Sequence, residues 1–246
     1  MEIGSVVQKV ETCTSTNDLA IKLAEKGADE GTVVMAEEQT KGRGTKGRSW
    51  QSATGKGLYA SVILRPKQRD ISLLPLMAGV ACAEAVRGAT GLEVGLKWPN
   101  DIVWRGKKLG GVLCESAFLG DTVVYAVLGL GLNLSQKRSD FPDELRPGAT
   151  SLRLVLKKEP ERAALERLLW QSLDRWYGLF NQGKIEEMIR AYELYLIISI
   201  GKVVKVAVEE EVLSGVFLGI DSRGRFRLEK NGREVILSPA EIQEIR

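Results

Sequence analysis

Residues 39–50 read Gln39-Thr-Lys-Gly-Arg-Gly-Thr-Lys-Gly-Arg-Ser-Trp50, with four cations and three glycines in eight consecutive positions and no acidic residue. These side chains are charged or absent, so the segment cannot contribute to a hydrophobic core. Glycine lets backbone N–H groups approach a ligand closely, and converging amides and cations form a binding site for anions. The segment therefore predicts an anion-binding loop, and a solvated basic loop without a ligand is the alternative.

Two phosphate-binding motifs almost match this loop. Its three glycines fit G-x-G-x-x-G, and residues 42–49 differ by one residue from G-x-x-x-x-G-K-[ST]. Either motif requires a helix directly after the glycines. Residues 49–57 are instead polar and rich in glycine, and residues 58–64 resemble a strand. A long loop between two strands excludes the Rossmann turn and the P-loop, and it favours a loop that closes over its ligand.

The composition is that of a globular protein, and it contains no histidine. The 246 residues are 44% hydrophobic and carry a formal net charge of +3. Without histidine, Ser-His-Asp and Cys-His catalysis and His-ligated metal sites are excluded. The chemistry must therefore rely on cations, amides and carboxylates, which suits reactions at phosphorus.

The cysteines and the apolar pattern indicate a cytoplasmic protein. Cys13, Cys82 and Cys114 form no C-x-x-C pair, so we expect neither structural disulfides nor a zinc cluster. No run of about 18 apolar residues predicts a membrane span, and the N-terminus lacks the pattern of a signal segment. We therefore expect no membrane partner.

The hydrophobic periodicity predicts two domains, at residues 1–198 and 199–246. In the first, strands alternate with helices, and Thr14-Ser-Thr-Asn17 is typical of a helix start. The second contains only short strands, with a hairpin signal at Asn231-Gly232, and it predicts a small SH3-like β-barrel. The predicted strands are residues 6–10, 32–36, 58–64, 109–118, 122–134, 203–208, 212–220, 226–229 and 234–237, and residues 94–104 lead into a predicted hairpin at 105–107. The predicted helices are one with apolar residues at 19–24 that stops at Gly27, then 71–89, 165–180 and 185–196.

Four motifs together resemble the biotin–protein ligases, which activate biotin with ATP and attach it to a carrier lysine. They are Ser15-Thr-Asn17, the loop of residues 39–50, Lys97-Trp-Pro-Asn-Asp101 followed by Lys108-Leu-Gly-Gly111, and Gly129-Leu-Gly-Leu-Asn133. Each motif alone is weak, but their order and spacing match the family along nearly the whole chain. The resemblance implies an α+β fold, with a class II synthetase-like mixed sheet flanked by helices and a small C-terminal SH3-like barrel.

The resemblance implies a biotin site with a few short polar groups in an apolar wall. The ureido ring of biotin offers one acceptor and two donors, which hydroxyl and amide side chains can match. Simple helix capping is the alternative role for Ser15 and Thr16. The implied biotin-binding residues are Ser15, Thr16, Asn17, Gln39, Gly42, Arg43, Lys108, Gly111, Gly129 and Gly131.

The resemblance also implies a cationic ATP site and a second step at a carrier lysine. Arg43, Arg48 and Lys108 would neutralise the repulsion between a carboxylate and the α-phosphate, and Mg²⁺ would be held mainly by the triphosphate. Asp101 is the candidate that attracts and deprotonates the carrier amine. The alternatives are a solvated hairpin for Lys108 and a simple turn for Asn100-Asp101. The implied catalytic residues are Arg43, Arg48, Lys108 and Asp101, and the implied ATP-binding residues are Arg43, Arg48, Trp50, Asn100, Lys108 and Asn133.

One position departs from the family pattern, because biotin ligases commonly carry arginine where this chain has Thr45. We expect the adenylate to be held less firmly here, unless Lys46 compensates. Some members begin with a DNA-binding domain, whereas this chain starts at the first predicted strand, so we expect no DNA partner. The resemblance implies a homodimer and a carrier that is the biotin domain of a carboxylase.

Two rival functions remain open at this point. A lipoate–protein ligase shares the acyl-adenylate chemistry but does not need the polar set for a ureido ring. A non-catalytic nucleic-acid-binding protein would combine a basic loop with an SH3-like barrel and stacking aromatics. The predicted barrel contains only Phe217 and Phe226 as aromatic residues, which disfavours this second rival.

Overall fold

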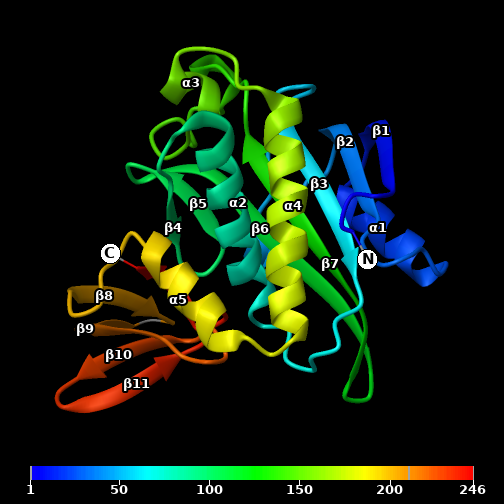
Figure 1. The fold of residues 1–246 in the computed structure, drawn as a ribbon. Coiled ribbons are helices and arrows are strands. Elements are labelled where there is room, and N and C mark those ends of the chain that lie inside the picture. Colours follow the sequence, from blue (N-terminus) through cyan, green and yellow to red (C-terminus); the bar gives the residue numbers. More distant parts are fainter. Residues whose placement is uncertain (1, 210, 246) are drawn as a thin grey trace.

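A seven-stranded mixed sheet forms the larger part of the molecule (Figure 1). The computed structural model describes residues 2–209 and 211–245, so Met1, Glu210 and Arg246 of the two predicted domains lie outside the described residues. The strand order is β1-β2-β3-β7-β6-β5-β4; β1 and β2 pair in parallel and the other neighbours are antiparallel. The strands are β1 (Val7–Cys13), β2 (Val33–Gln39), β3 (Gly57–Leu64), β4 (Gly95–Lys97), β5 (Asp101–Trp104), β6 (Lys107–Leu119) and β7 (Thr122–Asn133).

Helices cover both faces of this sheet. The long helices α2 (Leu74–Thr90) and α4 (Arg162–Asn181) lie side by side on one face (Figure 1), and α1 (Thr16–Glu25) packs on the other. Strand β3 is buried along its whole length because alternate side chains enter the two cores: Val62 joins the α2 side and Ile63 the α1 side. The remaining helices are α3 (Leu152–Leu156) and α5 (Ile185–Tyr195), and short 3₁₀ turns occur at η1 (Thr45–Gly47) and η2 (Arg138–Asp140).

The C-terminal part forms a separate antiparallel sheet that shares the main core. Its strand order is β11-β10-β9-β8-β12. Phe226 of this sheet packs on Trp98 with ring centroids 5.5 Å apart, and the Trp98 indole donates to the Gly224 carbonyl at 2.9 Å. Both residues therefore join the two sheets near β4. The strands are β8 (Val203–Val208), β9 (Glu211–Ile220), β10 (Phe226–Lys230), β11 (Arg233–Leu237) and β12 (Ile242–Ile245).

The structure confirms most of the predicted elements and corrects several boundaries. The hairpin between β10 and β11 turns at Asn231 and Gly232, both with positive φ, as this dipeptide indicates. Helix α2 begins at Leu74 rather than at residue 71, because the preceding residues form a turn and Pro75 occupies the first helical turn. Helix α3 and strand β12 were not predicted, since five and four residues are too short for a clear period.

Two features of the predicted organisation stay predictions. The C-terminal strands form a five-stranded antiparallel sheet with β11 and β12 at its edges, and closure of this sheet into an SH3-like barrel stays a prediction. The domain boundary between residues 198 and 199 likewise stays a prediction. Within the described residues, no helix combines the length and the apolar character that crossing a membrane requires.

Candidate active site

The basic loop and the ends of several strands enclose one cavity of about 290 Å³. Thirteen of the residues predicted from the sequence line it, although they come from five separate parts of the chain. The fold thus brings together most of the predicted site. These residues are Ser15, Thr16, Asn17, Gln39, Arg43, Arg48, Trp50, Asn100, Lys108, Gly111, Gly129, Gly131 and Asn133.

Two predicted residues lie outside this lining. Gly42 lines an adjoining cavity of about 390 Å³, which shares Gln39 and Trp50 with the first. Asp101 lies on β5 and pairs with Lys108, whose Nζ is 2.6 Å from its carboxylate. Asp101 therefore does not line the cavity itself, but it contacts Lys108, which does.

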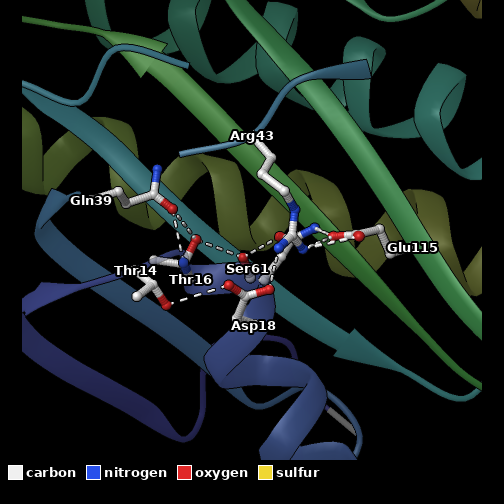
Figure 2. A network of polar contacts seen from close by, with 8 residues as sticks. Thr14, Thr16, Asp18, Gln39, Arg43, Ser61 and Glu115 are labelled. Atoms are coloured by element: carbon white, nitrogen blue, oxygen red, sulfur yellow. Dashed lines mark hydrogen bonds and ion pairs between the residues drawn. The ribbon is translucent and has the colours of Figure 1, made fainter. Parts of the chain in front are cut away.

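A buried chain of hydrogen bonds organises the neutral polar side of the cavity (Figure 2). The Gln39 amide oxygen accepts from the backbone N–H of Thr16 at 2.8 Å and from its hydroxyl at 3.1 Å. The Ser61 hydroxyl on β3 lies within donating distance of Thr16 Oγ1, at 2.7 Å, and of Asn17 Oδ1, at 2.5 Å. Because each group is held by its neighbour, these side chains face the cavity in one fixed arrangement.

Ser15 differs from its neighbours in this network. It stands at the N-cap position of α1 and is 3% exposed, but its hydroxyl does not cap the helix. Among the described residues the hydroxyl has no hydrogen-bond partner, and the residue lines the cavity. The capping alternative is therefore wrong for Ser15, and its hydroxyl remains available to a ligand.

Arg43 connects the polar network to two carboxylates (Figure 2). Its guanidinium pairs with Asp18 of α1 and with Glu115 of β6, the latter at 2.7 Å, and Glu115 also accepts from Asn17 at 2.7 Å. Burial alone would lower the pKa of Arg43, but the hydrogen bonds with Glu115 and Asp18 raise it above its usual value. The guanidinium is therefore a permanent cation at the cavity wall.

The other cations of the loop face different surroundings. Arg48 lines the cavity and donates to the carbonyl and hydroxyl of Thr45, at 3.3 and 3.2 Å. Lys46 is absent from the lining, and its ammonium donates to backbone carbonyls of the C-terminal sheet. Lys46 therefore does not take the place of the missing arginine in the cavity lining, because its side chain points to another surface.

Two glycines on β7, Gly129 and Gly131, leave space that neighbouring side chains occupy. A Cβ on Gly131 would lie 2.7 Å from the Trp50 ring, and a Cβ on Gly129 would collide with the Asn17 amide. The Trp50 indole N–H is buried and has no partner among the described residues. Trp50 thus packs on the sheet while forming part of the cavity wall, and the glycines provide the space for it.

The two asparagines at the far end of the cavity are held by backbone groups. Asn100 donates to the Val112 carbonyl at 2.8 Å, and Asn133 donates to the Thr150 carbonyl at 3.0 Å. Asn133 also accepts from Gln136 at 3.1 Å. The Asn133 side chain therefore fixes the segment that leaves β7.

Sequence reasoning missed part of the cavity wall and part of its polar network. Ser61, Asp18 and Glu115 hold predicted residues in place. Ser61 could have been found from the sequence, because its hydroxyl interrupts the apolar run of residues 58–64. The segment between β7 and α3 forms another part of the cavity wall. In the sequence, only a few isolated apolar residues within this polar loop indicated that it is partly buried. The missed lining residues of this segment are Phe141, Glu144, Leu145, Gly148 and Ala149.

The chain was compared with known proteins. Residues 9–133 match the biotin/lipoate A/B protein ligase family, and residues 199–243 match the biotin protein ligase C terminal domain. The biotin--[acetyl-CoA-carboxylase] ligase of Mycobacterium tuberculosis is 33% identical over 94% of this chain and 86% of that protein.

Solved structures of similar fold include ligand complexes. The biotin protein ligase from Aquifex aeolicus in complex with biotin and ATP has a TM-score of 0.84 and 28% identity, covering 98% of this chain and 99% of that one. The biotin protein ligase from Leishmania major in complex with biotinyl-5-AMP has a TM-score of 0.65 and 25% identity, covering 95% and 99%. With the matching family models, this shows that the chain is a ligase that belongs to the biotin/lipoate A/B protein ligase family.

Proposed function

We propose that this protein joins biotin to AMP at the expense of ATP and then transfers biotin to a lysine of a carrier protein. The observation that carries the proposal is the composition of one cavity wall. The lining combines neutral hydroxyl and amide groups of Ser15, Thr16 and Gln39 with the cations Arg48 and Lys108. A ureido ring suits the first set and a phosphate the second.

In the first step, a carboxylate oxygen of biotin forms a bond to the α-phosphorus of ATP, and pyrophosphate leaves. The two reacting groups are anions, so nearby cations lower the repulsion between them. Arg43, Arg48 and Lys108 supply this charge, and an incoming phosphate shares Arg43 with Asp18 and Glu115. No covalent enzyme intermediate is required.

In the second step, a carrier lysine nitrogen bonds to the acyl carbon, and AMP leaves with the bonding electrons. The amine must lose protons, since a free lysine is mostly protonated near neutral pH. Asp101 is our candidate for receiving a proton, and its pairing with Lys108 at 2.6 Å holds it beside the cavity wall. Asn100 is our candidate for contacting the nucleotide or the carrier lysine.

We place the adenine between Asn133 and the segment that follows β7. Phe141, Leu145 and Ala149 supply apolar lining there. Mg²⁺ would be held mainly by the triphosphate oxygens, because Asp18, Glu115 and Asp101 are already paired with Arg43 and Lys108. Within the described residues, no cluster of three acidic, cysteine or histidine side chains provides a separate metal site.

Several further features belong to this proposal. The carrier would be the biotin domain of a carboxylase, which the name of the mycobacterial relative supports. The three free cysteines support a cytoplasmic location. The five short antiparallel strands support an SH3-like barrel at residues 199–246, separate from a catalytic domain at residues 1–198.

We also propose a homodimer formed through β6. This strand pairs with β5 only along residues 107–111, so one edge of residues 113–119 has no partner strand among the described residues. Phe118 and Leu119 beside this edge are 52% and 78% exposed. An unpaired edge with exposed apolar side chains favours pairing with a second copy.

The proposal is tested by measuring pyrophosphate release and biotinyl-AMP formation with biotin and ATP, and with lipoate in its place. We expect biotin to support the reaction and lipoate to fail. Replacing Arg43 by Ala should lower the rate by roughly 10²–10³-fold, the usual cost of removing one group that stabilises a transition-state charge. The Lys41→Ala variant is the control, because the Lys41 side chain is exposed and does not line this cavity.

Three results would count against this assignment. Lipoate turnover without biotin turnover would favour a lipoate ligase. Tight, salt-sensitive RNA binding without pyrophosphate release would favour the nucleic-acid-binding alternative. An Arg43→Ala variant that folds and turns over within a few-fold of the wild type would show that the site residues are misassigned.

A further inference from the structure

The tip of the basic loop is attached to the C-terminal sheet. Lys46 stands in the η1 turn, and its ammonium donates to the carbonyl of Ile242, the first residue of β12, and lies 3.4 Å from the carbonyl of Ala240. The two segments are 196 positions apart in the sequence. Lys46 thus provides a direct contact between the loop and a part of the fold that does not line the cavity.

The backbone of Lys46 has an unusual conformation for a residue with a side chain. Its φ and ψ angles are 58° and 37°, in the left-handed region that glycine adopts most readily. Glycine alone would relieve this backbone cost, but it has no ammonium to reach the two carbonyls. The side-chain contact therefore gives a physical reason for a lysine at this position.

The contact can act on the cavity through the loop backbone. Residues 42–50 form a narrow hairpin in which Gly44 N–H donates to the Arg48 carbonyl at 2.7 Å and Trp50 N–H to the Gly42 carbonyl at 2.9 Å. Lys46 is at its tip, and Arg48 lines the cavity on the way back. A tether at the tip therefore restricts how far the hairpin can swing away from the cavity.

The surface that receives the tether is itself fixed. Besides the Trp98 contact, Glu193 of α5 accepts from the Ile220 N–H at 2.8 Å, and Ser72 donates to the Arg223 carbonyl at 2.7 Å. Trp98, Glu193 and Ser72 of the larger part thus hold β9, β10 and the turn between them. The tether connects the loop, through the edge strand β12, to a sheet that is packed on the larger part of the molecule.

We propose that Lys46 is a positioning residue that latches the basic loop onto β12 and so retains the adenylate between the two half-reactions. The inference rests on the proposed function, and it assigns to the C-terminal sheet the role of a support for the loop. It separates Lys46 from biotin recognition, because Thr16 and Gln39 belong to the buried network and Ser15 stands at the N-cap of α1, and none of the three is at the hairpin tip.

The experiment compares Lys46→Met, Lys46→Gly and Lys46→Arg in the full chain, with Lys41→Met as the control from the same loop. Methionine removes the ammonium and keeps the length, glycine also removes the backbone cost, and arginine can still donate to both carbonyls. The first measurement is hydrogen exchange of the Gly44 and Trp50 amides in the ligand-free protein. The second is the rate at which biotinyl-AMP dissociates, and the third is the affinity for biotin alone.

We expect exchange of both amides and dissociation of biotinyl-AMP to become about tenfold faster in the Met and Gly variants, as expected when a hydrogen bond to a charged group is lost. Arginine should restore both, Lys41→Met should match the wild type, and biotin affinity should change less than about twofold. Exchange that is unchanged in Lys46→Met would overturn the latch. Wild-type rates of amide exchange and biotinyl-AMP dissociation in Lys46→Gly would show that the ammonium contact is not needed, and would also overturn the latch.

Unchanged adenylate dissociation with accelerated exchange would overturn the retention role. A wild-type chain that forms no biotinyl-AMP would instead overturn the proposed function. The exchange measurement distinguishes these cases, because it reports on the contact without any ligand.

Discussion

Arg43 illustrates how the surroundings of a residue define what it can do. Two carboxylates, Asp18 and Glu115, hold its guanidinium at the cavity wall and keep its pKa above the usual value. The same carboxylates compete with phosphate for this cation, so the ligand must offer at least comparable hydrogen bonds. Such competition favours a phosphate-bearing ligand over a weakly charged one.

Thr45 allows a direct test of the missing cation. Its hydroxyl accepts from Arg48 at 3.2 Å, and the residue lines the cavity. We expect Thr45→Arg to slow biotinyl-AMP dissociation about tenfold, or about 1.4 kcal/mol, because it adds a charge-assisted contact to the phosphate. Thr45→Val is the control, since it removes the hydroxyl without adding charge, and the idea fails if arginine gives no slowing.

At the scale of elements, helices α2 and α4 are connected by a charged group at their interface. Glu84 of α2 accepts from Arg175 at 2.6 Å, from the Trp176 indole at 3.0 Å and from the Ser172 hydroxyl. Burial alone would raise the pKa of Glu84, but the hydrogen bonds from these three residues lower it below the usual value of a glutamate. The carboxylate therefore stabilises the helix pair while it is ionised.

Glu84→Gln should lower the free energy of unfolding by roughly 1–3 kcal/mol at pH 7, because a charged acceptor is lost from a partly buried network. Since the folded pKa is depressed, this stabilisation is present above the unfolded pKa and is lost as pH falls through the folded value. The difference between variant and wild type should therefore shrink in acid, which urea unfolding at pH 7 and pH 3 can measure.

The matched control is Glu93→Gln. Glu93 pairs with Arg87 at the surface, where its side chain is 69% exposed. Its loss should cost less than about 1 kcal/mol, as for other exposed pairs. Equal effects of the two substitutions would contradict a special role for Glu84.

At the scale of the whole molecule, two sheets share one core, and among the described residues β6 has no partner strand on one side beyond residue 111. Trp98, Phe217 and Phe226 belong to the same hydrophobic cluster, so the C-terminal sheet is packed on the larger part rather than tethered by a linker. The open edge of β6 lies on the other side of that strand from β7. The C-terminal sheet is therefore held within the molecule, and this side of β6 carries no strand of the described chain.

We expect sedimentation velocity to show a dimer that Phe118→Lys shifts toward the monomer, because a charge beside the open edge opposes strand pairing. Ile236→Lys is the control, since Ile236 is 42% exposed and lies in the C-terminal sheet, away from β6. A wild-type chain that sediments as a monomer at all concentrations tested would contradict the proposed dimer.

The amino-acid sequence alone determined most of the elements and most of the predicted residues that line the cavity. Apolar residues at period two or 3.6 identify strands and long helices because burial imposes these periods locally. The four short motifs, through their resemblance to a known family, imply thirteen residues that the fold gathers around one cavity. Elements of four or five residues, such as α3 and β12, are too short for this reasoning.

Only the tertiary structure decided which partner each polar group has. Arg43 meets Asp18 and Glu115, Lys108 meets Asp101, and Lys46 meets carbonyls at the other end of the chain. The wall contributed by residues 141–149 became visible in the same way. The physical reason is that a local pattern reports whether a side chain is buried, whereas its partner depends on which distant segments the packing brings within hydrogen-bonding distance.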